Sequence, residues 1–163
     1  MSGADINSLE DLLDREHIRD LLSRYPMAFD DRDWAAWQEL WTEDVVWVVD
    51  GAEIVGLPAV REFMVGCLPA DYGSKHLCGS PVIDLGKDGV SAHARTDVVW
   101  FAANYEAAIV ARYVDDLVKV DGHWRIARRD EVVTRYVPGP PPMSDESQAL
   151  SGATMRPLGG FSG

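Results

Sequence analysis

Ser23-Arg-Tyr-Pro-Met-Ala-Phe-Asp-Asp-Arg-Asp-Trp34 is the stretch that decides how this chain is organised. Before it, apolar residues recur at helical spacing, which predicts a helix over residues 9–29 with Ser8 as its N-cap. Pro26 lies in the last turn of that helix, where its missing N–H should kink or loosen the backbone. The stretch therefore closes a first helix and opens a second one.

The second helix is predicted from a run of large apolar residues. Asp33 is its expected N-cap, and residues 42–44 are its expected end. We interpret its large side chains as core packing rather than as a surface on which a ligand stacks, because aromatic residues dominate the energetics of cores. These side chains are Trp34, Trp37, Leu40 and Trp41.

Short elements are predicted next. Residues 45–49 are β-branched or aromatic, which favours a strand. Asp50-Gly51 is a hairpin turn signal, so a short strand should return over residues 52–55. Residues 56–64 are typical of a short third helix, with a proline in its first turn.

After a loop over residues 66–74, four strand-like segments are predicted: 75–85, 90–102, 107–120 and 123–137. In the second segment, period-two alternation gives one apolar face, formed by Ala92, Ala94, Thr96, Val98 and Trp100. The order of two helices, two strands, one helix and a final antiparallel meander predicts an α+β fold. Its helices should gather on one face of a strongly curved sheet.

A single domain is expected over residues 1–137, since the chain has 163 residues. Pro138-Gly-Pro-Pro-Pro142 opens a tail over residues 138–163 that is rich in Pro, Gly and Ser. Two interpretations of this tail stay open. It is extended and partly disordered, or it docks on a neighbouring subunit or over a pocket mouth through Leu150, Met155, Leu158 and Phe161.

Composition and charge argue against several classes of protein. An apolar content of 47% with 26% charged residues is typical of a soluble globular protein. A formal net charge of -12 argues against a nucleic acid or an acidic membrane as a partner, because phosphates repel such a surface. Cys67 and Cys78 show no paired spacing, which indicates reduced thiols and a cytoplasmic location. We find no signal-peptide pattern and no apolar run long enough to span a bilayer.

Over residues 8–137 the chain resembles the SnoaL-like, nuclear-transport-factor-like superfamily of cone-shaped α+β barrels. Four motifs carry the likeness: Ile18-Arg-Asp-Leu-Leu-Ser-Arg-Tyr25, Phe29-Asp-Asp-Arg-Asp-Trp34, Thr42-Glu-Asp-Val45 and Val120-Asp-Gly-His-Trp-Arg-Ile126. Within the superfamily, the nearest patterns are those of scytalone dehydratase, bile-acid 7α-dehydratase and hexachlorocyclohexane dehydrochlorinase. The superfamily also includes dioxygenase small subunits and pure binding domains, so the fold alone does not imply an activity.

The resemblance implies an acid–base site. The catalytic aspartate of these enzymes falls on Asp30, and their catalytic histidine falls on His76 in Ser74-Lys-His-Leu77. The tyrosine of the bile-acid enzyme falls on Tyr25. A carboxylate bonded to one imidazole nitrogen orients the ring and stabilises its charged form, which leaves the other nitrogen as a base. Tyr25 is expected to donate a hydrogen bond to a carbonyl or to a leaving hydroxyl.

Other positions are expected to bind the substrate. Phe29, Val49 and Trp100 stand at or near positions where scytalone dehydratase has two tyrosines and a second histidine, so the site departs from that enzyme there. Trp47 is expected to add an apolar wall and Tyr113 a hydroxyl. Arg129 resembles an arginine of the dehydrochlorinase. Such a site needs no metal and no cofactor.

Three functions remain open at this stage. The first is a cofactor-free lyase, by dehydration or a related β-elimination, or an isomerase that acts on a mid-sized apolar cyclic substrate. The second is a non-catalytic subunit or scaffold resembling a ring-hydroxylating dioxygenase small subunit, and the third is a module that binds a hydrophobic ligand. The resemblance and the long apolar strands also predict a homodimer or a homotrimer.

Overall fold

The computed structural model describes residues 8–102 and 105–137. It places three helices along this part of the chain: α1 (Leu9–Asp30), α2 (Trp34–Gln38) and α3 (Leu57–Cys67). The strands are β1 (Trp41–Val49), β2 (Ala52–Val55), β3 (Lys75–Cys78), β4 (Val82–Leu85), β5 (Ser91–Ala102), β6 (Ala107–Val120) and β7 (His123–Val137). The predicted tail over residues 138–163 lies outside the described residues.

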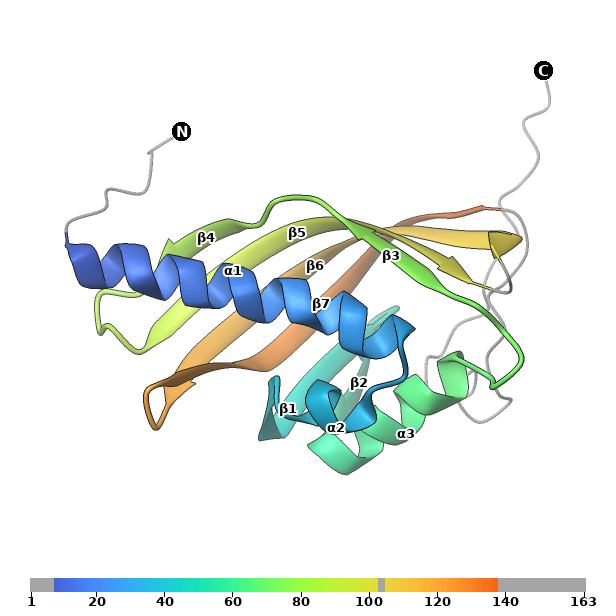
Figure 1. Ribbon diagram of the computed structural model, residues 1–163, viewed down its shortest axis with the longest axis horizontal. Helices are drawn as coiled ribbons and strands as arrows, with labels where there is room; N and C mark the ends of the chain where they lie inside the picture. Colours follow the sequence, from blue (N-terminus) through green and yellow to red (C-terminus); the bar gives the residue numbers. More distant parts are fainter. Residues whose placement is uncertain (1–7, 103–104, 138–163) are drawn as a thin grey trace, which may run out of the picture.

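The strands form one mixed sheet in the order β2-β1-β7-β6-β5-β3, and β4 pairs with another part of β5. Neighbouring strands are antiparallel except β1 and β7, which run parallel. The sheet is strongly curved and stays open among the described strands, with α1 lying along one face and α2 and α3 gathered near the C-terminal end of α1 (Figure 1). The predicted α+β class, with a curved mixed sheet wrapped around the N-terminal helices, is confirmed.

The first helix is fixed to the sheet by its own polar side chains. Ser8 caps it by accepting a hydrogen bond from the backbone N–H of Asp11. Asp14 accepts hydrogen bonds from Trp124 Nε1 at 3.0 Å and from Lys119 Nζ at 2.8 Å. Arg15 Nη1 donates to the carbonyl of Ile83 at 2.6 Å. These contacts fix the N-terminal half of α1 to β4, β6 and β7.

The second helix is shorter than predicted. It ends at Gln38, and Trp41 already belongs to β1, where it is the register partner of Ile126 on β7. The pairing begins one residue earlier, because the backbone N–H of Ile126 donates to the carbonyl of Leu40 at 2.9 Å. The parallel pairing with β7 therefore overrides the helical spacing of Leu40 and Trp41.

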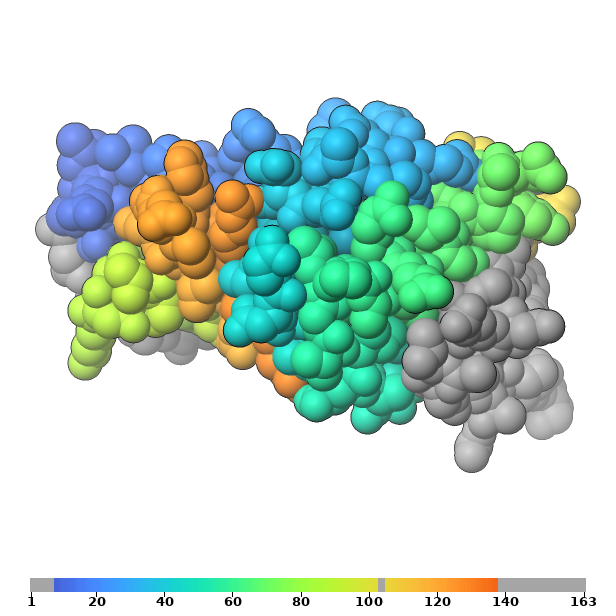
Figure 2. Space-filling model, turned by 90° about the horizontal axis from the view of Figure 1, so that it is seen from below, coloured from blue at the N-terminus to red at the C-terminus, as the bar shows by residue number. Residues whose placement is uncertain are grey.

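Trp37, Leu40 and Trp41 are buried in the core, as predicted, whereas Trp34 is only partly buried and packs against it. Trp37, Trp41 and Trp47 are at most 3% exposed, and their rings meet in sequence with centroids 5.0 and 5.4 Å apart. Aromatic pairs at such separations add stability beyond the area that they bury. The space-filling view shows α2 and α3 closing the lower face of the molecule beside the C-terminal half of α1 (Figure 2).

Two further boundaries differ from prediction. The expected strand over 75–85 is divided into β3 and β4, which pair with opposite halves of β5. Pro81 lies in the gap and has no N–H to give to a ladder. Helix α3 continues to Cys67. The hairpin between β1 and β2 is confirmed: Asp50 and Gly51 both have positive φ (48° and 78°), as a type I′ turn requires.

Candidate active site

Asp30 and His76 meet at the junction of α1 and β3. Asp30 is the last residue of α1, and His76 is the second residue of β3. Asp30 Oδ1 lies 2.8 Å from His76 Nδ1, and Asp30 Oδ2 accepts the backbone N–H of His76 at 2.8 Å. Ser74 Oγ also donates to Oδ1, at 3.0 Å. Both side chains are at most 3% exposed, so three hydrogen bonds hold a buried carboxylate in one orientation.

The environment fixes the charges of this pair. Burial favours the protonated carboxyl of Asp30, but the hydrogen bonds and charge of His76 and the hydroxyl of Ser74 outweigh it, so the pKa of Asp30 is lowered. Burial also lowers the pKa of His76, against the opposing effect of Asp30. At neutral pH the pair is therefore a carboxylate and a neutral imidazole. Nδ1 then carries the hydrogen that Asp30 accepts, and Nε2 is left to accept a proton.

His76 lies at the wall of an apolar cavity of about 40 Å³. That space holds about three water molecules. Aromatic and aliphatic side chains supply most of the wall, from α1, α3 and five strands; the lining residues are Tyr25, Phe29, Trp47, Val49, Asp50, Phe63, Met64, Cys67, His76, Trp100, Ile109, Tyr113, Glu131 and Tyr136. In such surroundings, a proton transfer to His76 would be shielded from bulk solvent.

Most of the residues predicted to form the site do line this cavity. Tyr25 meets the His76 ring edge-on at 5.5 Å, and Trp100 stacks on the other side of that ring at 5.9 Å. Phe29 approaches it edge-on at 5.2 Å. Trp47, Val49 and Tyr113 complete the wall. Asp30 lies behind His76, where it contacts the imidazole and not the cavity.

The two tyrosines are hydrogen-bond donors at neutral pH. Burial raises the pKa of Tyr25 and of Tyr113 well above the ordinary value. Their rings are perpendicular, with centroids 5.7 Å apart. A buried phenol that stays protonated can stabilise negative charge on a substrate oxygen.

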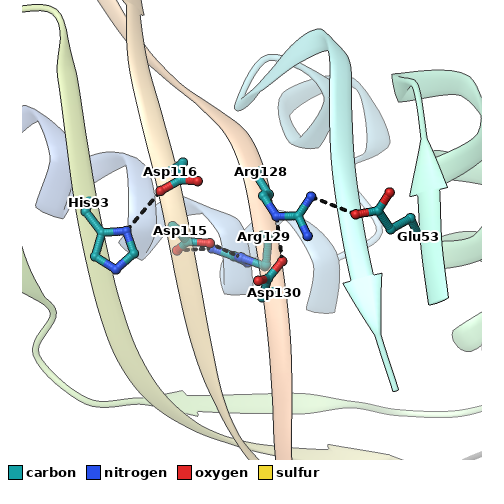
Figure 3. A network of polar contacts seen from close by, with 7 residues as sticks. All are labelled: Glu53, His93, Asp115, Asp116, Arg128, Arg129 and Asp130. Atoms are coloured by element: carbon teal, nitrogen blue, oxygen red, sulfur yellow. Dashed lines mark hydrogen bonds and ion pairs between the residues drawn. The ribbon is translucent and has the colours of Figure 1, made fainter. Parts of the chain in front are cut away.

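Arg129, which was predicted to bind substrate, lies behind the cavity wall. Arg129 is 1% exposed and does not line the cavity. Its Nε and Nη2 donate to the two carboxylate oxygens of Asp115 on β6, at 2.6 and 2.9 Å (Figure 3). Its guanidinium lies over the rings of Tyr113 at 4.1 Å and Tyr25 at 4.3 Å. Arg129 therefore supports the cavity wall from behind.

Arg129 lies on an interior strand of the sheet, because β7 runs between β1 and β6. Its neighbour Arg128 points the other way and forms ion pairs with Glu53 and Asp130, both at 2.9 Å (Figure 3). The two adjacent arginines thus have opposite roles. One is a buried structural ion, and the other belongs to the charged outer side of the sheet.

Glu131 lines the cavity and was not identified from the sequence. It is partly buried, and burial raises its pKa to about 7. The simple alternation that marks inward positions is interrupted in β7, where the register shifts between the pairs Asp116–Arg128 and Leu117–Ile126. Because of that irregularity, counting by two from Trp124 places Arg129 and Glu131 on the wrong side of the strand.

No three His, Cys, Asp or Glu side chains within residues 8–102 and 105–137 come together as metal ligands. None of the helices described is long and apolar enough to cross a membrane. Cys67 and Cys78 are both free thiols, the first buried and the second exposed.

The fold and the buried Asp–His pair define a class of α+β proteins with a cavity between the helices and a curved sheet. Residues 10–130 match the model of the SnoaL-like domain, and the chain belongs to that family. No protein of curated function matches it.

Three solved structures have a similar fold. A hexachlorocyclohexane dehydrochlorinase (LinA type 2) has a TM-score of 0.70 at 17% identity, over 81% of this chain and 93% of its own. A candidate scytalone dehydratase of Novosphingobium aromaticivorans has a TM-score of 0.69 at 22% identity, over 78% and 89%. The beta subunit of a candidate aromatic-ring-hydroxylating dioxygenase from the same organism has a TM-score of 0.63 at 20% identity, over 78% and 94%. At these identities the likeness shows the fold.

Proposed function

We propose that this chain is a lyase that eliminates water or halide from a mid-sized, mostly apolar cyclic substrate, or an isomerase that moves a double bond by the same proton abstraction. The observation that carries the proposal is the 2.8 Å contact between His76 Nδ1 and Asp30 Oδ1 at the wall of an apolar cavity. The dehydratase and dehydrochlorinase among the neighbours of similar fold support it.

The proposed reaction begins with proton transfer from carbon to His76. Nε2 takes a proton from the carbon next to an electron-withdrawing group such as a carbonyl, and Asp30 stabilises the imidazolium that forms. The electrons of the broken C–H bond form a C=C bond, and the leaving group departs from the neighbouring carbon with the electrons of its own bond. Tyr25 donates a hydrogen bond to the oxygen on which negative charge develops.

A substrate of this kind must move the cavity wall, because a space of about 40 Å³ is far smaller than a cyclic organic molecule. Met64 is one wall residue suited to such movement, since an unbranched thioether repacks easily. Tyr136 is another, because it is only partly buried.

The test measures elimination by the full-length protein on two probes, β-hydroxycyclohexanone and β-chlorocyclohexanone, by the absorbance of the conjugated enone. We expect the wild type to accelerate at least one elimination. His76→Ala should lose about 10²-fold or more in kcat/KM, whereas the control His93→Ala, at a half-exposed position on the sheet, should retain it. If neither probe is turned over, or if the two variants lose the same activity, the proposal fails.

A second candidate is a non-catalytic subunit or scaffold, or a module that binds a hydrophobic ligand. The small size of the cavity favours it, with Trp47 and Trp100 both in its wall, and a dioxygenase beta subunit has a similar fold. On this alternative, His76→Ala changes the free energy of unfolding and leaves no activity to lose.

We also propose a homodimer or homotrimer in the cytoplasm. Exposed apolar side chains on the sheet support self-association, and they include Leu77, Val82 and Val132, each more than half exposed. The two free thiols are consistent with a reducing compartment. Light scattering should give two or three times the chain mass of 18.0 kDa; a stable monomer would contradict the assembly.

A further inference from the structure

The cavity wall carries a carboxyl group, that of Glu131, in addition to the imidazole of His76. Glu131 enters its wall from β7, whereas His76 enters from β3 at an edge of the sheet. The two tyrosines lie between them. Tyr25 contacts the His76 ring at 5.5 Å and the Tyr113 ring at 5.7 Å, and Tyr113 is the register partner of Glu131 across β6 and β7. One ligand in this cavity would therefore have an imidazole on one side and a carboxyl group on another.

The groups around Glu131 decide its protonation. Burial raises its pKa to about 7, Arg129 on the same strand opposes that rise, and Asp50 from the β1–β2 turn adds to it. The carboxylate of Asp50 accepts a hydrogen bond from the Tyr136 hydroxyl at 3.1 Å. The remaining ionisable groups of the wall are His76 on β3, Tyr25 on α1, Tyr113 on β6 and Cys67 on α3, and the last three stay protonated at neutral pH because burial raises each pKa. Near neutral pH, Glu131 is thus the acidic group of the wall best poised to give up a proton.

We propose that Glu131 is the proton donor to the leaving oxygen, and that the substrate class is therefore a β-hydroxy carbonyl compound rather than a halide. This inference rests on the proposed function. His76 Nε2 removes the proton from the α-carbon, the C–H electrons form the C=C bond, and the C–O bond breaks. The carboxyl proton of Glu131 goes to the departing oxygen to give water. The cycle ends with His76 protonated and Glu131 ionised, and proton exchange with solvent restores both.

The leaving group explains why a second acid points to this class. A chloride ion is stable and departs without a proton, so a dehydrochlorinase needs only the base. Hydroxide is a poor leaving group, and a general acid that protonates it contributes about 10²-fold or more. A carboxyl group that stays partly protonated near neutral pH in an apolar cavity suits that role. Acid and base roles are commonly divided in this way between two groups whose environments push their pKa values apart.

The test compares the same two probes in Glu131→Gln and in a matched control, Glu106→Gln, which removes an exposed carboxylate from the β5–β6 turn. We expect Glu131→Gln to lower kcat/KM for β-hydroxycyclohexanone at least about 10-fold more than for β-chlorocyclohexanone. The control Glu106→Gln should leave kcat/KM unchanged for both probes. His76→Ala should lower both. Equal effects of Glu131→Gln on the two probes would overturn the inference while leaving the proposed function in place.

A second measurement is independent of turnover. Carbon-13 NMR of the Glu131 carboxyl, assigned by its absence in Glu131→Gln, should show a midpoint of about 7. A midpoint near the ordinary value of 4.5 would overturn the inference, because the group would then be ionised at neutral pH. A wild type inactive on both probes would instead remove the proposed function and, with it, the role of Glu131.

Discussion

Asp30 binds His76 twice, through the imidazole Nδ1 and through the backbone N–H, with both contacts at 2.8 Å. The pair joins the end of α1 to the edge strand β3, which are 46 residues apart in the chain. A carboxylate that holds both the ring and the backbone of its partner fixes the direction of Nε2 as well as its basicity. This relationship is the basis for the predictions about stability and proton transfer.

The free energy of unfolding should depend on pH through the protonation of His76. Its folded pKa is lowered below 6.5, so the unfolded state binds more protons as the pH falls. The contribution of neutral His76 is therefore fully present above about pH 6.5 and declines as the pH falls below that value. We expect the difference in unfolding free energy between wild type and His76→Gln to shrink on acidification, measured by urea denaturation at several pH values. A difference that stays constant over this pH range would contradict this.

Glu131 should give a slope of the opposite sign. Its folded pKa is raised to about 7 from 4.5, so the folded state binds more protons between these values. Relative to Glu131→Gln, the wild type should be most stable below about pH 4.5 and should lose that advantage as the pH rises through about 7. The same urea series measures it. A difference that grows with rising pH would show that Glu131 is ionised and favourably paired in the folded protein.

The ion pair of Arg129 and Asp115 should be costly to break. Both residues are at most 1% exposed, and Arg129 also stacks on Tyr25 and Tyr113. Asp115→Ala leaves a buried charge uncompensated, which costs about 3–5 kcal/mol of unfolding free energy. Removing both charges in Arg129→Met/Asp115→Leu should recover much of that loss.

Arg128 offers a matched control for this pair, because it is adjacent in sequence and its ion pairs are partly exposed. Arg128→Met should cost about 1 kcal/mol or less. Thermal or urea unfolding of all three variants provides the comparison. Equal losses in Asp115→Ala and Arg128→Met would show that the buried pair is not the stronger constraint.

The fold and the Asp30–His76 pair differ in how well the sequence alone predicts them. Helical spacing and cap residues predicted α1, and alternation predicted the buried face of β5, because both depend on local periods. Asp30, His76 and Tyr25 were placed by resemblance to a family, since no local pattern can show that residues 46 apart form a hydrogen bond. Glu131 was missed because the register shift in β7 changes which residues point inward, and such a shift is set by the neighbouring strand. Arg129 was assigned by resemblance, which could not show that its guanidinium is paired with the buried Asp115.

The loop before β3 should depend on Arg32. Its Nη2 donates to the carbonyl of Pro69 at 2.9 Å and also to those of Ala70 and Tyr72, so it holds the segment that leads to Ser74 and His76. We expect Arg32→Ala to speed amide hydrogen exchange at residues 70–76. The control Arg24→Ala removes an exposed ion pair on α1 and should not speed that exchange. Unchanged exchange in Arg32→Ala would mean that the loop is held by its other contacts.

The most direct test of the central pair is the titration of His76 by NMR in wild type and in Asp30→Asn, with Asp31→Asn as a control that removes the adjacent exposed carboxylate. We expect His76 to titrate below its ordinary value of 6.5 in the wild type. Asp30→Asn should lower that pKa by about one unit or more, since the carboxylate that stabilises the imidazolium is lost, and one unit is worth about 1.4 kcal/mol. Asp31→Asn should leave the titration nearly unchanged. If His76 titrates identically in wild type and in Asp30→Asn, the two residues are not coupled, and the proposed acid–base site does not exist.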